Sequence, residues 1–109
     1  MTRQKFIEYM NARFTRCENT FASKNREYAT EENFMRNFEN GVGISTCRTP
    51  EAVAWNYATK HLESIRSIIS DIDDGASAPS LSLTTEKFGD AINYLIIIEA
   101  MLLHRNENV

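Results

Sequence analysis

The chain has 109 residues, with 12 Lys and Arg against 15 Asp and Glu, and therefore a formal net charge of −3. This balance excludes dominant binding to nucleic-acid phosphates, which relies on Lys and Arg, although a local basic patch stays open. A hydrophobic content of 42% is typical of a globular chain. The length predicts one domain, residues 1–109, with a core that is marginal for a monomer.

The cysteines and the apolar runs place the chain in a cell compartment. Cys17 and Cys47 lie in different segments without the Cys-x-x-Cys spacing of zinc sites, which favours free thiols in a reducing cytoplasm. The longest apolar run, residues 91–103, is too short to span a bilayer. The opening residues lead into an amphipathic helix without a leader pattern, so we expect no membrane association and a cytoplasmic protein.

Residues 3–23 are predicted to form a long amphipathic helix. Its apolar face repeats at steps of three and four residues through Phe6, Met10, Phe14, Cys17 and Phe21. A polar connector over 24–33 should follow. A short helix near 31–40 is then expected to end at Gly41, where glycine tolerates the left-handed cap.

The third helix is predicted from its start signals. Thr49 is the N-cap, Pro50 occupies the first position and Glu51 supplies an acid in the first turn. The helix should run to about Ile72. The inner face is expected to comprise Ala54, Ala58, Leu62, Ile65, Ile69 and Ile72.

The segment 73–82 contains turn-forming residues and predicts a linker. The last helix is expected over about 85–105, with Thr84 as its N-cap. Its apolar residues wrap nearly all round, and such helices are usually buried. The predicted fold is therefore an all-α bundle of three long helices and one short helix, forming a homodimer that covers the excess apolar surface.

The short linker makes the last two long helices antiparallel neighbours. The expected register places Asp90 near Ser67 and Asn93 near Ser64, with Glu63 within about a turn of both. Polar groups kept in register inside apolar surroundings indicate either a satisfied structural network or a site.

The acids of this seam predict a magnesium site. Mg²⁺ takes octahedral oxygen ligands, commonly a few carboxylates together with phosphate oxygens. We predict Glu63, Glu86 and Asp90 as metal ligands, with Lys60 neutralising phosphate charge. The alternative is an ordinary solvated seam of salt bridges, because acid pairs at i and i+4 are common on helices.

Other candidates carry two interpretations each. His61 suits the edge of the core better than a catalytic base. Trp55, Tyr57 and Tyr94 could stack on a base or belong to the core or an interface. The basic loop from Lys24 to Tyr28 could contact phosphate or be a solvated turn.

An ordered set of short motifs gives a family resemblance. The pieces are Lys24-Asn25-Arg26-Glu27-Tyr28, Asn37-Phe38, Trp55, Lys60-His61, Glu86 and Asp90-Ala91-Ile92-Asn93-Tyr94-Leu95. In this order they resemble the phage nucleotide-modification-associated domain family over residues 24–103. That family is related to the MazG-like nucleotide pyrophosphohydrolases, whose facing helices hold Mg²⁺ around a nucleoside triphosphate. A phage-encoded chain would work in the host cytoplasm.

The resemblance implies roles for matched positions. Glu86 and Asp90 match acids of the last family helix, and Lys60 matches its lysine. The implied substrate-binding residues are Lys60, Asn93, Tyr94, Tyr28 and Lys24. The MazG-like enzymes carry Glu-x-x-Glu on their first catalytic helix, whereas this chain offers Glu63 alone. The metal-ligand set is therefore incomplete, and no catalytic residue is assigned.

Two functions follow as hypotheses. The first is a phage-type protein that binds a nucleoside triphosphate through Mg²⁺, with pyrophosphohydrolase activity as its enzymatic form. The second is a non-enzymatic interaction protein that inhibits a bacterial defence system such as a CRISPR effector. Small size and the incomplete metal set favour the second, and the ordered motifs favour the first.

Overall fold

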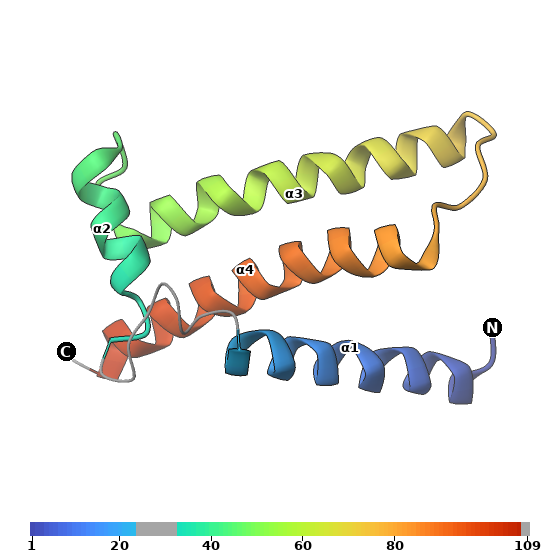
Figure 1. The fold of residues 1–109 in the computed structure, drawn as a ribbon, viewed down its shortest axis with the longest axis horizontal. Helices are drawn as coiled ribbons and strands as arrows, with labels where there is room; N and C mark the ends of the chain where they lie inside the picture. The colour runs from blue at the N-terminus through green and yellow to red at the C-terminus, as the bar shows by residue number, and fades with distance from the viewer. Residues whose placement is uncertain (24–32, 108–109) are drawn as a thin grey trace. The chain divides into compact units, whose positions relative to one another are not determined.

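A computed structural model describes residues 1–23 and 33–107 of the chain. These residues form helices and no strand, which confirms the predicted all-α class (Figure 1). The elements are α1 (Arg3–Ser23), α2 (Arg36–Ile44), α3 (Pro50–Asp73) and α4 (Leu81–Glu107). The chain divides into two compact units, Met1–Asn37 and Phe38–Val109, and each is described by itself.

The first unit contains α1, whose observed bounds match the predicted helix. Thr2 begins it, because the Thr2 hydroxyl accepts a hydrogen bond of 3.1 Å from the backbone N–H of Lys5. Cys17 is buried. At the end of the helix the ring of Phe21 meets that of Phe34 edge-on, with 6.1 Å between centroids.

The short helix α2 differs from its predicted bounds. Gly41 was expected to end it, but the helix continues to Ile44. Gly41 is buried, and a Cβ on this residue would lie only 2.7 Å from Cγ1 of Val53 on α3. The glycine therefore allows close approach of two helices and does not act as a cap, which sequence spacing alone could not distinguish.

The start of α3 confirms the predicted cap. The Thr49 hydroxyl accepts a hydrogen bond of 3.2 Å from the backbone N–H of Ala52, and Pro50 occupies the first turn. The helix ends at Asp73. Gly75 follows with φ of 99°, a left-handed conformation that glycine adopts without strain.

The last helix begins four residues before its predicted start, so the prediction of Thr84 as N-cap was wrong. The Ser80 hydroxyl accepts a hydrogen bond of 3.1 Å from the backbone N–H of Leu83, which makes Ser80 the capping residue. The Thr84 hydroxyl instead donates to the Ser80 carbonyl at 2.9 Å. Serine and threonine both suit this role, and the serine comes first in the chain.

Helices α3 and α4 form an antiparallel hairpin in the second unit, as predicted (Figure 1). Ala54 and Ala58 of α3 are fully buried, and Ile97 and Met101 of α4 are nearly so. No helix in the described residues combines the length and apolarity needed to cross a bilayer.

Candidate functional site

Four rings gather where α2 meets the hairpin, and we call them the aromatic cluster: Phe38, Tyr57, His61 and Tyr94. Tyr94 of α4 is the central ring. Its centroid lies 5.9 Å from that of Tyr57 and 6.4 Å from that of Phe38. The imidazole of His61 stacks on Tyr94 at 5.4 Å with an interplanar angle of 16°. These separations lie within the range in which aromatic pairs attract one another.

Asp90 lies beside this cluster. Its carboxylate oxygen Oδ2 is 3.7 Å from Nδ1 of His61, which gives an ion pair when the imidazole is protonated. The His61 side chain is 26% exposed, so the pair is reachable from solvent. Partial burial and ring stacking agree with the prediction of a core-edge histidine. The sequence did not predict that the carboxylate of Asp90 would lie within ion-pair distance of this histidine.

The hydroxyl of Tyr94 is held in its protonated form. Partial burial is the largest influence that raises the pKa of Tyr94, followed by the negative charge of Asp90 and by Tyr57. The phenol therefore stays a hydrogen-bond donor further into the alkaline range than an exposed tyrosine does.

Asn93 carries the most unusual atom of the site. Its side-chain oxygen Oδ1 is buried and has no hydrogen-bond partner among the described residues. Leaving a buried acceptor unpaired costs about 1–3 kcal/mol, and most native groups of this kind are paired. Asn93 precedes Tyr94 and lies one helical turn beyond Asp90. The residue next to the central ring of the cluster therefore carries a buried acceptor that the described residues leave unpaired.

The predicted metal ligands do not form one group. Glu63 is exposed and accepts two hydrogen bonds from the guanidinium of Arg66. These bonds, and then the positive charge of Arg66, lower the pKa of the Glu63 carboxyl. Glu86 is exposed on α4, one turn before Asp90. Among the residues that the structure describes, no three His, Cys, Asp or Glu side chains are placed to hold a metal ion together.

Contacts across the hairpin show which side chains meet. His61 stacks on Tyr94 and Glu51 pairs with Arg105, which agrees with the expected register to within about two residues. Asp90 was expected near Ser67, but its carboxylate reaches along the helix to His61. At one end of the hairpin, Arg105 also donates a hydrogen bond to Glu51, which fixes the last turns of α4 against the start of α3.

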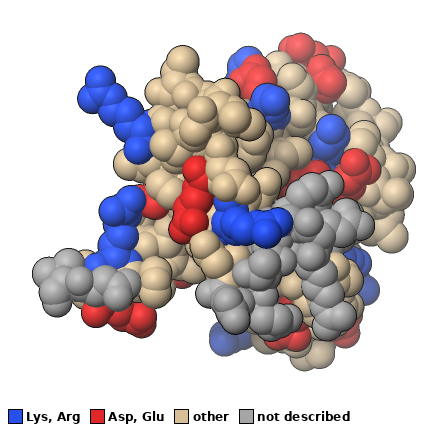
Figure 2. Space-filling view, turned by 60° about the vertical axis from the view of Figure 1, so that its left-hand side comes forward, with Lys and Arg blue, Asp and Glu red and all other residues tan. Residues whose placement is uncertain are grey.

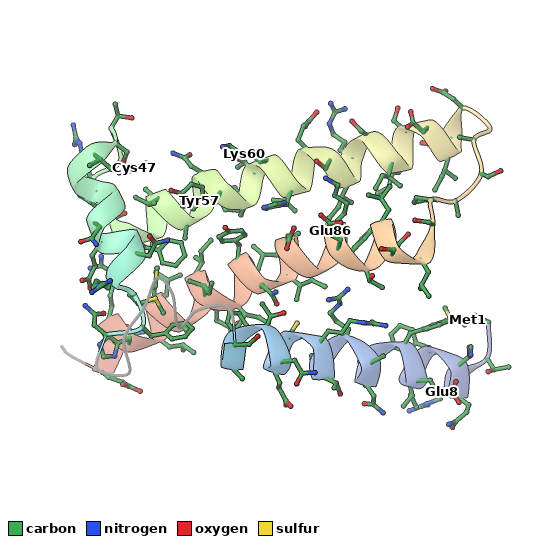
Figure 3. The ribbon with its side chains drawn as sticks, viewed as in Figure 1. Met1, Glu8, Cys47, Tyr57, Lys60 and Glu86 are labelled. Carbon is green, nitrogen blue, oxygen red and sulfur yellow. The ribbon has the colours of Figure 1, made fainter. Side chains whose placement is uncertain are left out.

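The remaining predicted residues fall in different places. Lys60 is exposed on α3, next in sequence to His61 (Figure 3). Lys24 and Tyr28 lie outside the described residues. The sequence singled out Tyr57 as a residue that could stack on a base, but neither Tyr57 nor Phe38 was assigned to the site. Two i, i+4 spacings in the sequence could have pointed to the cluster. Tyr57 and His61 share one face of α3, and Asp90 and Tyr94 share one face of α4.

Acidic and basic side chains are interspersed over the face that Figure 2 shows, with broad uncharged surface between them. This distribution accords with the small formal net charge of −3.

A scan of family models, a search of curated proteins and a search of solved structures each find no match. The resemblance to the phage nucleotide-modification-associated domain family therefore stays a prediction from its motifs.

Proposed function

We propose that this protein binds a nucleotide, with the base held beside the aromatic cluster. The observation that carries the proposal is the buried Oδ1 of Asn93, an acceptor without a partner in the described residues. Exocyclic amines and ring N–H groups of nucleobases are donors of the kind that such an acceptor lacks. Tyr57 is more than a third exposed, so one ring of the cluster offers surface on which a base can stack.

The polar neighbours suit the rest of a nucleotide. The carboxylate of Asp90 lies one turn before Asn93 and within ion-pair distance of His61. Lys60 is the neighbouring cation that we assign to the phosphates. His61 adds a positive charge when it is protonated, and it lies within ion-pair distance of the Asp90 carboxylate.

Mg²⁺ enters this proposal with the nucleotide. The ion is commonly bound through one or two carboxylates together with substrate phosphates, so a full set of protein ligands is not required. Asp90 and Glu86 are the carboxylates that we assign to it. Glu63 would have to leave Arg66 in order to take part. Pyrophosphohydrolase activity remains a prediction for the bound triphosphate, and no residue is assigned to that step.

The test is a substitution that separates binding from folding. Asn93→Leu removes the unpaired acceptor, so we expect the protein to keep or gain thermal stability while nucleotide affinity falls by at least about tenfold. Affinity is measured by calorimetry with the common ribo- and deoxyribonucleoside triphosphates, with and without Mg²⁺. Pyrophosphate release is followed in the same samples.

The matched control is Asn106→Leu, which changes an exposed amide in the last turn of α4. We expect it to leave affinity unchanged. If the wild-type protein binds none of the nucleotides, or if Asn93→Leu binds as tightly as the wild type, the proposal is wrong. Binding without pyrophosphate release would identify a nucleotide-binding module that lacks hydrolase activity.

A second function, the non-enzymatic inhibitor of a bacterial defence system, is favoured by a separate observation. Large apolar side chains are exposed along the described helices, among them Trp55 on α3 and Leu103 on α4. Exposed apolar surface of this kind marks protein–protein interaction sites. Stoichiometric recovery of one defence protein by the tagged chain, retained when Asn93 is replaced by Leu, would support this function over the first.

A further inference from the structure

A seven-residue repeat runs along one face of α4. We call it the heptad stripe, and it comprises Leu81, Phe88, Leu95 and Leu102. All four side chains lie on α4 and are at least 36% exposed. Four large apolar residues at this spacing define a seam of the coiled-coil kind, because a seven-residue repeat keeps one face of a helix in register with a partner helix.

The stripe and the nucleotide site occupy different faces of α4. Asp90 follows Phe88 by two residues and therefore lies about 200° around the helix. The site faces α3, whose His61 contacts Asp90. Leu81 to Leu102 spans about 32 Å of helix, comparable to the diameter of a small domain. This surface is extensive enough for a helix-to-helix interface and independent of the site.

The stripe is complementary to itself. When two copies of α4 run antiparallel about a two-fold axis near Ile92, Leu81 meets Leu102 of the other copy and Phe88 meets Leu95. An isologous interface requires such a pattern, since one patch must fit the same patch turned around. The equal spacing of large apolar residues on both sides of the point between Ala91 and Ile92 meets this condition.

Charge selects the antiparallel orientation. The intervening seam positions, four residues after the first three stripe residues, are Thr85, Ile92 and Glu99. In a parallel pair the two Glu99 carboxylates would face each other, and like charges in a seam are destabilising. In the antiparallel pair Glu99 lies level with the hydroxyl-bearing residues Thr84 and Thr85 of the other copy. We propose that two copies of this chain associate through an antiparallel α4–α4 seam centred on Ile92.

The first test uses the full chain and a matched pair of variants. Leu95→Glu places a charge in the middle of the stripe, whereas Ile69→Glu places one on an exposed apolar residue of α3. Sedimentation equilibrium at micromolar concentration should give a dimer for the wild type and for Ile69→Glu. It should give a monomer for Leu95→Glu, since desolvating an unpaired charge weakens association by at least about a hundredfold.

Two further variants keep the proposal testable if Leu95→Glu does not fold. Glu99→Leu removes the carboxylate from the seam and should lower the dissociation constant by about tenfold or more. In a chain with both native cysteines replaced, Leu81→Cys with Leu102→Cys should form a covalent dimer on oxidation, and Leu81→Cys alone should not.

Several outcomes would overturn the proposal. A monomeric wild type is one, and equal masses for the two Glu variants is another. A covalent dimer from Leu81→Cys alone would reverse the orientation. A monomer that Leu95→Glu unfolds and Glu99→Leu stabilises would show that the stripe is covered within its own chain.

Discussion

At the α2 end of the hairpin, Ala54 and Ala58 of α3 have no exposed surface. At the linker end, Ile69 and Ile72 of the same helix leave about half of theirs exposed. The small residues allow close approach of neighbouring elements, and α2 adds Gly41 and Phe38 to the same region. Within the second unit α2 lies at this end alone, far from the 74–80 linker (Figure 1).

The comparison shows that burial in the hairpin depends on the presence of a third element. Large apolar residues at the linker end have only the opposite helix to pack against, and two helices bury one face each. The aromatic cluster lies at the packed end, where its rings are held in place. We therefore expect substitutions at the two ends to differ strongly in their effect on stability.

The largest effect should come from Phe38→Ala at the packed end. Phe38 is buried against Tyr57 and Tyr94, so removing its ring leaves a cavity and two unsupported rings. Such changes lower the free energy of unfolding by about 3–5 kcal/mol. Urea unfolding followed by circular dichroism would measure the loss, and nucleotide affinity should fall with it.

The matched change at the linker end is Ile69→Ala. It shortens an aliphatic side chain that is already half exposed. We expect a loss of less than about 1 kcal/mol. Similar losses for Phe38→Ala and Ile69→Ala would contradict the difference between the two ends.

Gly41→Ala should have the next largest effect. The added Cβ would lie 2.7 Å from Cγ1 of Val53, and this clash outweighs the gain in helix propensity. We expect a net loss of about 1 kcal/mol. In a double-mutant cycle, Gly41→Ala with Val53→Ala should lose about 1 kcal/mol less than the sum of the single changes. Additive losses would show that the two helices do not meet at this point.

These positions also show how far the sequence could predict the fold. Helix bounds followed from local signals where the cap was unambiguous, as for Thr49 and Pro50. The predicted bounds were wrong where one residue type is compatible with two different local structures. Gly41 suits a helix end and a close helix contact equally well, and only the position of Val53 decides between them.

The site was predictable only in part for a similar reason. Asp90, Asn93 and Tyr94 were identified from their spacing on one helix, which is a local property. Their partners His61 and Tyr57 depend on the register between two helices and on the direction in which each side chain extends along its helix. Linker length constrains the order of the helices but does not fix that register.

A smaller effect concerns the ionisation of Tyr94. Burial raises its pKa in the folded protein above the ordinary value near 10. The stability that depends on the neutral phenol is therefore complete below pH 10. It is lost as the pH rises, because the unfolded chain ionises first. Between pH 9 and 11 the melting temperature of the wild type should fall by about 2 °C more than that of Tyr94→Phe.

The control for this measurement is Tyr9→Phe, which changes a well-exposed tyrosine of α1. Its pH profile should follow that of the wild type. A profile for Tyr94→Phe that also follows the wild type would mean that the cluster does not exclude water from the phenol, and the packed end would then be more open than its burial indicates.

The smallest effect is expected between the two ends, at Glu63. Its carboxylate accepts both hydrogen bonds from Arg66 on the exposed side of α3, where solvent and salt screen the pair. The lowered pKa means that the pair contributes above the ordinary carboxyl pKa and that this contribution is lost as the pH falls through the folded value. Glu63→Gln should therefore shift the melting temperature at pH 7 by less than about 2 °C.

Because Arg66 engages the Glu63 carboxylate, the Mg²⁺-dependent nucleotide affinity of Glu63→Gln should also stay within about twofold of wild type, which calorimetry measures. A tenfold loss of affinity at unchanged stability would instead make Glu63 a metal ligand and extend the site from the packed end along α3.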